Sequence, residues 1–211
     1  IKMINIIYTI GYSGFKIDEF ISKIREYKID VIIDVRSSPY SQYFKEYNKE
    51  NICRVLNELK GKKIYYRNYN LEFGARQLDT GENYYPKGYL DFERFSKSEN
   101  FLLGVKKIED SMKQNYTFVL MCAEKDPFTC HRAILVSRAF FKKGYKIIHL
   151  MPDGENLTQE DIEKQLLDRY AKNRHQMGLF NSNIISEEEH INNAYRKHNE
   201  KIGYSIEKEE D

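Results

Sequence analysis

The residues that could do chemistry gather in one short segment, which runs from Met121 to Arg132 and reads MCAEKDPFTCHR. Glu124 follows an apolar stretch, and a carboxylate at the end of a buried strand is desolvated, which raises its pKa towards the range of a general acid or base. We expect Glu124 to act in this way, aided by His131. The alternative is that Glu124 caps a helix or forms an ion pair with Arg132, and the residue types do not separate the two.

Two cysteines frame this segment. Cys122 and Cys130 are separated by seven residues, and His131 follows at once. This is not a standard zinc spacing, and Phe128 stands where the arginine of a thiol-phosphatase loop would be. We therefore expect structural cysteines and no metal. A reactive thiol at Cys130, near the start of a predicted helix, is an alternative, and a metal site is another.

Three arginines could hold an anion. Arg132 falls in the first turn of a predicted helix, where free N–H groups favour an anion and where a cation by itself is unfavourable. Arg36 and Arg76 would add positive charge from two other segments. The alternatives are an ion pair between Asp34 and Arg36, and an Arg132 that reaches solvent or Asp126. The sequence leaves these alternatives open.

Further candidates follow the first two predicted strands. Tyr12 and Ser13 lie just after the first, and Asp34 ends the second, with Ser41 a few residues later. The glycine pair at 11 and 14 is too short for a dinucleotide-binding fingerprint. The catalytic candidates are Glu124, His131, Ser13 and Asp34, and the candidates for substrate or anion binding are Arg36, Arg76, Arg132, Tyr12 and Ser41.

Apolar runs that alternate with helix-period segments predict a three-layer α/β/α fold around a mainly parallel, five-stranded sheet. We expect a Rossmann-like order of 3-2-1-4-5. In that order the first and fourth strands are neighbours, so the candidate residues meet at the carboxyl edge, where such sheets bind ligands. The expected strands are Asn5–Ile10, Val31–Val35, Ile64–Tyr66, Thr117–Cys122 and Lys146–Met151.

Residues 1–178 are expected to form the α/β domain and residues 179–211 an acidic, helical extension. Ser98, Thr158 and Ser186 stand where helix N-caps are expected. The last helix has a weak apolar face and is followed by a charged run, which predicts a loosely attached tail. Residues 68–88 have no clear period, and such a long irregular segment predicts either a functional loop or a disordered one.

The 211 residues carry a net charge of +2. Residues 181–211 contain four Lys/Arg and eight Asp/Glu, which leaves +6 for the rest of the chain. A basic body is compatible with an anionic substrate but also with an ordinary solvated surface. No apolar run reaches the ~18 residues of a membrane span, and three cysteines fit reduced thiols. We expect a cytoplasmic protein without a membrane partner.

Three blocks of the sequence resemble a bacterial and archaeal family, the domain of unknown function 488. The resemblance runs from about Ile6 to Tyr170 and is most specific in the third block. Tyr12 stands where the family often has histidine, and Leu71 to Arg76 keep a further family block only in part. The resemblance implies an α/β fold and a shared site but no reaction. The blocks are Thr9-Ile10-Gly11-Tyr12-Ser13, Asp34-Val35-Arg36 to Pro39 and Ser41, and Cys122-Ala123-Glu124 to Cys130-His131-Arg132.

These observations lead to three hypotheses about function. The first is a hydrolase or transferase acting on a phosphate-bearing substrate, such as a nucleotide or a nucleic-acid component. The second is a nucleic-acid-binding module without catalysis, which would use the basic body and the tyrosines near residue 85 to stack bases. The third is a thiol or metal site at Cys122, Cys130 and His131. The sequence identifies no cofactor and no oligomeric state.

Overall fold

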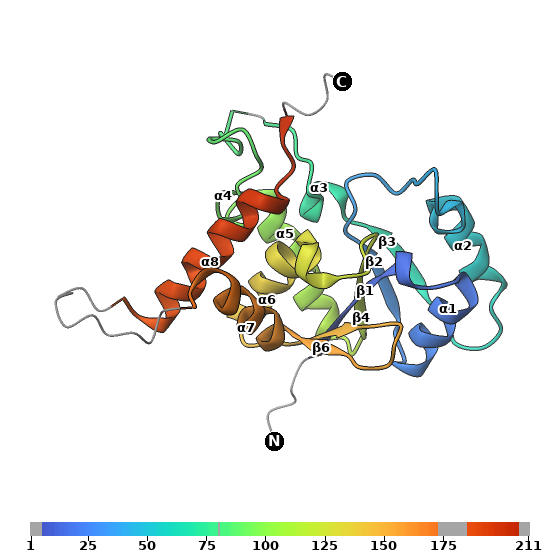
Figure 1. Ribbon diagram of the computed structural model, residues 1–211. Helices are drawn as coiled ribbons and strands as arrows, with labels where there is room; N and C mark the ends of the chain where they lie inside the picture. Colours follow the sequence, from blue (N-terminus) through green and yellow to red (C-terminus); the bar gives the residue numbers. More distant parts are fainter. Residues whose placement is uncertain (1–5, 80, 173–184, 207–211) are drawn as a thin grey trace.

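A six-stranded sheet forms the centre of the protein (Figure 1). The computed structural model describes residues 6–79, 81–172 and 185–206. Five strands are parallel, and the short β6 pairs antiparallel with β5 at one edge. The strands are β1 (Ile6–Gly11), β2 (Val31–Asp34), β3 (Tyr65–Asn68), β4 (Phe118–Cys122), β5 (Lys146–Leu150) and β6 (Leu157–Thr158).

The strand order is β3-β2-β4-β1-β5-β6. The predicted order 3-2-1-4-5 is therefore wrong in one exchange, because β4 rather than β1 lies beside β2. Both strands are apolar and largely buried, so their side chains do not reveal which of them is central. The predicted contact between the first and fourth strands is confirmed, with Gly11 opposite Cys122 at their carboxyl ends.

Helices cover both faces of the sheet, as the predicted three-layer architecture requires (Figure 1). The apolar cores on the two faces are separate clusters of buried side chains. One face carries α1 (Ile17–Glu26) and α2 (Lys49–Glu58). The other carries α5 (Glu99–Met112), a π-helix (Arg132–Ser137) that runs into α6 (Arg138–Lys142), α7 (Gln159–Tyr170) and α8 (Glu187–Ile202).

Short elements fill the loops between these helices and strands. The region expected to be irregular holds α3 (Asn70–Phe73), and α4 (Phe92–Phe95) precedes α5. Single turns of 3-10 helix occupy Tyr12–Gly14, Lys45–Tyr47 and Pro127–Thr129. No helix in the described part of the chain is long and apolar enough to cross a lipid bilayer.

The predicted helix caps are confirmed. The Ser98 side chain accepts a hydrogen bond from the backbone N–H of Phe101, and the Ser186 side chain accepts one from Glu189. Thr158 and Asp161 form a reciprocal capping box at the start of α7. Each side chain satisfies a backbone donor that the first turn of a helix leaves without a partner.

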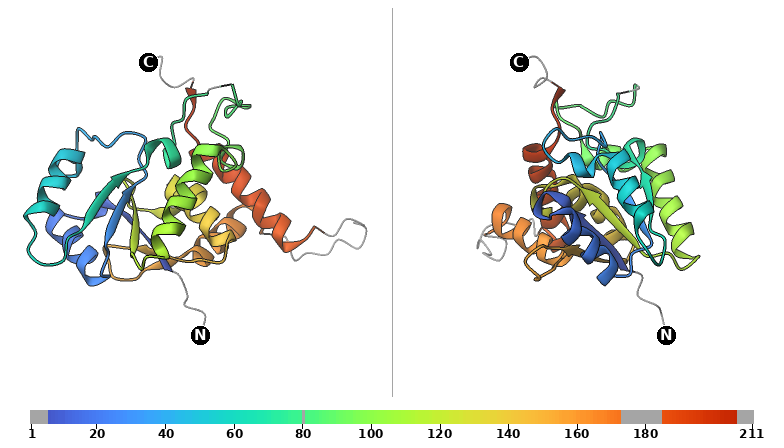
Figure 2. Two further views of the ribbon diagram at one scale, coloured as in Figure 1. Left: turned by 180° about the vertical axis from the view of Figure 1, so that it is seen from behind. Right: turned by 90° about the vertical axis from the view of Figure 1, so that its right-hand side faces the viewer.

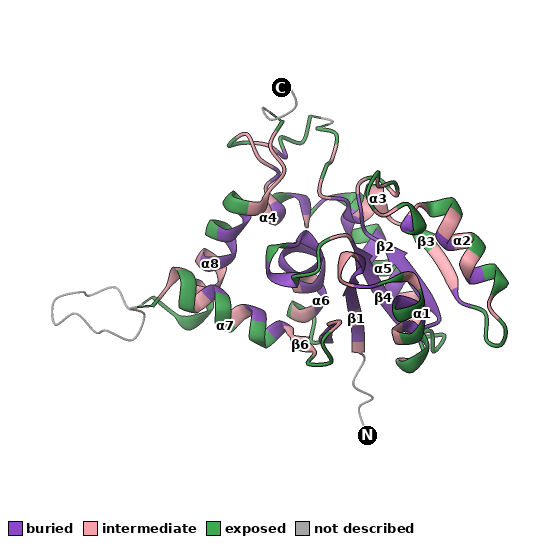
Figure 3. Cartoon of the chain, turned by 45° about the vertical axis from the view of Figure 1, so that its right-hand side comes forward, coloured by how far each residue is buried: buried purple, intermediate pink, exposed green. Residues whose placement is uncertain are grey.

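Helix α8 is firmly packed, so the prediction of a loosely attached tail is wrong for this helix. It lies along α7 on the outer side of the helical layer (Figure 2), and one side of it is buried (Figure 3). Its buried residues include Tyr195, His198 and Asn199. The polar atoms of these side chains are buried and form hydrogen bonds. A prediction based on apolar residues alone does not detect such packing. Residues 179–184 and 207–211 of the expected extension lie outside the described residues.

Candidate functional site

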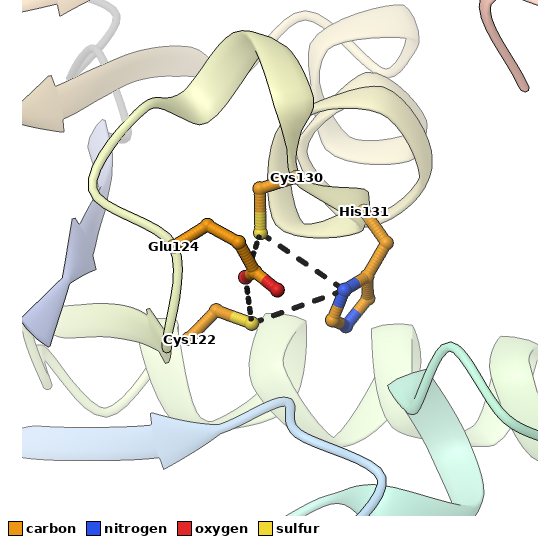
Figure 4. Close-up of side chains that lie close together, drawn as sticks. All are labelled: Cys122, Glu124, Cys130 and His131. Atoms are coloured by element: carbon orange, nitrogen blue, oxygen red, sulfur yellow. Dashed lines mark hydrogen bonds between the residues drawn. The ribbon is translucent and has the colours of Figure 1, made fainter. Parts of the chain in front are cut away.

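Four chemically active side chains meet at the carboxyl end of β4 (Figure 4). Cys122 ends the strand, Glu124 lies in the following loop, and Cys130 and His131 stand where the chain enters the π-helix. One potential ligand atom from each side chain lies within 4.8 Å of all the others. Both thiols donate hydrogen bonds to the same carboxylate oxygen of Glu124, each at 3.0 Å.

The loop between the two cysteines folds back because its backbone is fastened at several points. The Asp126 side chain accepts from the N–H of Phe128 at 2.9 Å, and Pro127 starts the 3-10 turn with its preset φ. The guanidinium of Arg132 donates to the carbonyls of Glu124 at 2.5 Å and Lys125 at 3.0 Å. This return of the chain brings Cys130 to Cys122.

Gly11 supports the same loop from β1. A Cβ atom at this position would lie 1.8 Å from the carbonyl oxygen of Glu124, so only glycine lets the two backbones approach this closely. The next turn adds a hydrogen bond from the N–H of Ser13 to the carbonyl of Ala123 at 3.0 Å. The sequence prediction that the loops after the first and fourth strands lie together is confirmed.

His131 is oriented towards the sulfur atoms. Its Nε2 lies 2.8 Å from the carbonyl oxygen of Val35, and because a carbonyl only accepts, Nε2 carries the proton. Nδ1 lies 3.8 Å from the sulfur of Cys122 and 4.0 Å from that of Cys130. In the neutral imidazole this nitrogen presents its lone pair to the cluster. Metal-binding histidines are held in the same way, with the second nitrogen donating to a backbone carbonyl.

Burial and mutual charge shift the pKa values of the two thiols in opposite directions. Burial, followed by the hydrogen bond and charge of Cys130, raises the pKa of Cys122. Burial also opposes ionisation of Cys130, but the hydrogen bond from Cys122 and the charges of Arg132 and His131 outweigh it and hold the pKa of Cys130 below its ordinary value.

The two remaining groups respond to this charge. Burial of the carboxylate and the neighbouring Cys130 raise the pKa of Glu124. Burial opposes a charged His131, yet its interactions with Cys130 and Glu124 raise its pKa. One thiol therefore ionises ahead of the other, and a cation among these groups would neutralise their combined charge.

Asp34, Arg36 and Tyr12 form a closed, buried network next to the cluster. Arg36 donates to both carboxylate oxygens of Asp34, at 2.6–3.1 Å, and to the hydroxyl of Tyr12 at 3.1 Å. It also donates to the carbonyl of Tyr47, and Tyr66 donates to Asp34. Of the alternatives left open by the sequence, the ion pair between Asp34 and Arg36 is the one observed.

The other two arginines are also directed at protein groups. Arg132 is fully buried, and besides the two loop carbonyls it donates to the hydroxyl of Thr9. Arg76 lies apart from the cluster, where its guanidinium stacks 4.6 Å from the ring centre of Tyr204. Ser41 stabilises a turn by accepting from the N–H of Phe44 at 3.1 Å. Of the nine predicted site residues, only Glu124 and His131 belong to the cluster.

Sequence reasoning missed the role that Cys122 and Cys130 share with Glu124. It compared the spacing of the cysteines with known linear patterns, whereas their contact depends on the return of the loop. A signal was present in Pro127 and Asp126, which are typical of a tight turn, between a strand end and a helix start. A turn at that point predicts that the residues on its two sides meet.

The comparisons with known proteins bear on this segment. The family described as "Domain of unknown function DUF488" matches residues 16–139, more than half of the chain. The matched region contains Asp34, Arg36 and all four residues of the cluster. No curated protein and no solved structure matches the chain. On the extent of the family match, the chain belongs to the DUF488 family.

Proposed function

We propose that this protein is a metal-dependent enzyme in which Cys122, Cys130 and His131 bind a zinc-like divalent cation and Glu124 serves as the general acid–base group. The observation that carries the proposal is the convergence of the four ligand atoms within 4.8 Å, with Nδ1 of His131 presented to both sulfurs. This proposal differs from the metal-free interpretation that the cysteine spacing alone favours.

The donor set and its dimensions support zinc. Two thiolates and an imidazole are ligands that zinc prefers. With Zn–S near 2.3 Å and Zn–N near 2.0 Å, neighbouring ligand atoms of a tetrahedral site lie roughly 3.5–3.8 Å apart. The sulfur–Nδ1 separations of 3.8 and 4.0 Å are close to this range. A small contraction around an ion would complete the geometry.

Glu124 differs from the other three residues because part of it reaches solvent, although its carboxylate lies against the two thiols, whereas the other three residues are buried. Three buried protein ligands and one accessible position are typical of catalytic rather than structural zinc. A cation held by Cys122, Cys130 and His131 would lower the pKa of a water molecule, and Glu124 would accept a proton from the nucleophile and return it to the leaving group. Zinc deaminases divide the same roles among histidine, two cysteines and a glutamate, and the likeness is chemical only.

The metal content of the purified, reduced protein tests the proposal. We expect about one zinc equivalent in the wild type and loss of the metal in Cys130→Ser and His131→Gln. Cys53→Ser is the matched control, because Cys53 lies on α2 outside the cluster. Cobalt in place of zinc should show thiolate-to-metal charge-transfer absorption that Cys53→Ser retains. A wild type that binds neither metal would contradict the proposal.

The Glu124→Gln variant distinguishes two roles of Glu124, that of a metal ligand and that of the acid–base group. If Glu124 acts on water, the variant keeps the metal and loses hydrolytic turnover; if it is the fourth ligand, the metal affinity falls as well. Because the amide cannot accept a proton, turnover is lost in both cases. A variant with full metal content and full turnover would remove Glu124 from the mechanism.

Thiol catalysis is the second candidate, favoured by the opposite pKa shifts of Cys122 and Cys130. In that case the protein would be metal-free, and iodoacetamide would alkylate Cys130 at a pH well below that required by Cys53. The phosphate-bearing substrate expected from the sequence stays a prediction, as does the nucleic-acid-binding alternative. Neither can rely on Arg36 or Arg132, whose donors are directed at protein groups.

A further inference from the structure

A separate cavity of about 150 Å³ lies where α4, α6 and α8 meet. Its wall contains four cationic side chains and one acidic one. Apolar side chains of Phe92, Ile134 and Leu135 complete part of the lining. The charged lining residues are Lys97, Arg138, Lys142, Arg196 and Glu93.

The one acid in the lining is already engaged. Glu93 accepts from Arg196 at 2.8 Å and lies 3.6 Å from the ammonium of Lys97. Within residues 6–79, 81–172 and 185–206, no acidic side chain lies at ion-pair distance from Arg138 or Lys142. The cavity therefore keeps positive charge that its own carboxylate does not neutralise.

Arg138 is held in place by contacts that, within the described parts of the chain, engage only one of its guanidinium N–H groups in a hydrogen bond. Its guanidinium stacks 3.9 Å from the ring centre of Tyr195, and Nη2 donates to the Asn192 side chain at 2.7 Å. A guanidinium has five N–H donors in a fixed fork. Burial lowers the pKa of Arg138, against the attraction of Tyr195, Glu93 and Glu163, because a partly buried charge is costly without a bound counter-ion.

We infer that this cavity binds a small oxyanion, a phosphate or carboxylate group, between Arg138 and Lys142. The planar fork of a preoriented arginine matches two oxygens of such a group. A cavity of ~150 Å³ is large enough for a benzene ring, so it accommodates one phosphate or carboxylate group but not an entire nucleotide. The apolar wall at Phe92 and Ile134 accommodates a short hydrocarbon part. The site does not depend on the metal proposal.

Calorimetric titration with inorganic phosphate, at low and constant ionic strength, tests this site. We expect saturable binding to the wild type and at least tenfold weaker binding to Arg138→Gln. Ser96→Glu should abolish binding, because Ser96 lines the cavity and the new carboxylate would occupy it. Lys106→Gln removes the same charge from an exposed position on α5 and should bind like the wild type.

Benzoate and phenyl phosphate distinguish the two forms of oxyanion, since the tighter ligand identifies the group that the cavity prefers. Thermal unfolding of each variant shows whether it is folded, and Lys142→Gln provides a second loss of charge if Arg138→Gln is not. Absence of binding to the wild type for all three probes would overturn the inference. Equal binding by the wild type, Ser96→Glu and Lys142→Gln would overturn it as well.

Discussion

At the scale of single residues, Arg132 fastens the loop that brings the two cysteines together. Its charge is completely buried, and its donors reach the carbonyls of Glu124 and Lys125 and the hydroxyl of Thr9. In the sequence, Arg132 is typical of the family and lies beside a helix start, which indicated anion binding. Its actual partners are main-chain oxygens of the preceding loop, which no linear pattern reveals.

Arg132→Met should destabilise the protein and disperse the cluster. The substitution leaves two loop carbonyls without donors, at about 1–3 kcal/mol each, so urea denaturation should show a loss of about 2–6 kcal/mol. Zinc retention should fall in parallel. Arg132→Lys should recover little, since an ammonium cannot span the same acceptors as the fork. An unchanged denaturation midpoint for Arg132→Met would contradict this role.

His149 gives the protein a specific sensitivity to acid. It is fully buried between the Thr9 hydroxyl at 2.7 Å and Gln159 at 3.1 Å. Burial, with a contribution from Arg132, lowers its pKa to about 3. The unfolded chain takes up a proton near pH 6.5 but the folded protein does not, so stability is lost as the pH falls from about 6.5 towards 3, by about 1.4 kcal/mol per unit.

The substitution His149→Gln should make the stability of the protein less dependent on pH. We expect the free energy of unfolding of the variant, measured by urea denaturation between pH 7 and pH 5, to fall less steeply than that of the wild type. His190→Gln is the control, because His190 is only partly buried on α8 and no bond to its ring is described. Parallel curves for wild type and His149→Gln would show that His149 is not the group responsible.

At the scale of elements, the junction from β4 through the 3-10 turn to the π-helix makes the site. The apolar run of β4 and the predicted helix start near Cys130 located its two ends from the sequence alone. The sequence predicted a helix start at this point but not a π-helix, because the side chains of the segment have the apolar character of an ordinary helix. Its wider turn is a property of the backbone under tertiary packing and often marks a functional segment.

Gly11→Ala should break the contact between β1 and this junction. The new Cβ would overlap the Glu124 carbonyl, and backbone atoms cannot move aside cheaply. We expect a loss of about 3 kcal/mol, at the upper end for overpacking, together with loss of bound zinc. Gly14→Ala is the control, since its Cβ would meet the flexible Lys125 side chain at 3.0 Å. Equal effects of the two substitutions would refute the steric argument.

At the scale of the whole molecule, α8 links the two ends of the helical layer. Nε2 of His198 donates to the carbonyl oxygen of Phe128 at 2.7 Å, inside the loop of the candidate site, and so connects the C-terminal helix to that loop. Asn199 accepts from the N–H of Phe92 at 2.8 Å and donates to the carbonyl of Leu90 at 2.9 Å. Because the carbonyl can only accept, His198 acts as the donor.

Asn199→Ala should lower the stability of the whole protein by about 2 kcal/mol, since it removes both partners of buried backbone groups. Chemical denaturation provides the measurement, and hydrogen exchange should show earlier opening of α8. Glu200→Ala, the adjacent exposed position on the same helix, should leave the denaturation curve unchanged. Similar losses in the two variants would contradict the specific role of Asn199.

The sequence by itself determined the α/β class, the positions of the main strands and the helix caps, and it singled out the segment from Cys122 to Arg132 as the candidate site. These depend on local periodicity, capping and turn chemistry, all of which act over a few residues. Only the tertiary structure decided that β4 lies between β1 and β2, and that Arg36 and Arg132 are directed inwards at protein groups. It also decided that two thiols with seven residues between them contact one carboxylate and one imidazole. The reason is that these features depend on which distant backbone carbonyls accept hydrogen bonds and on how closely two loops approach each other. The spacing of residues along the sequence contains neither kind of information.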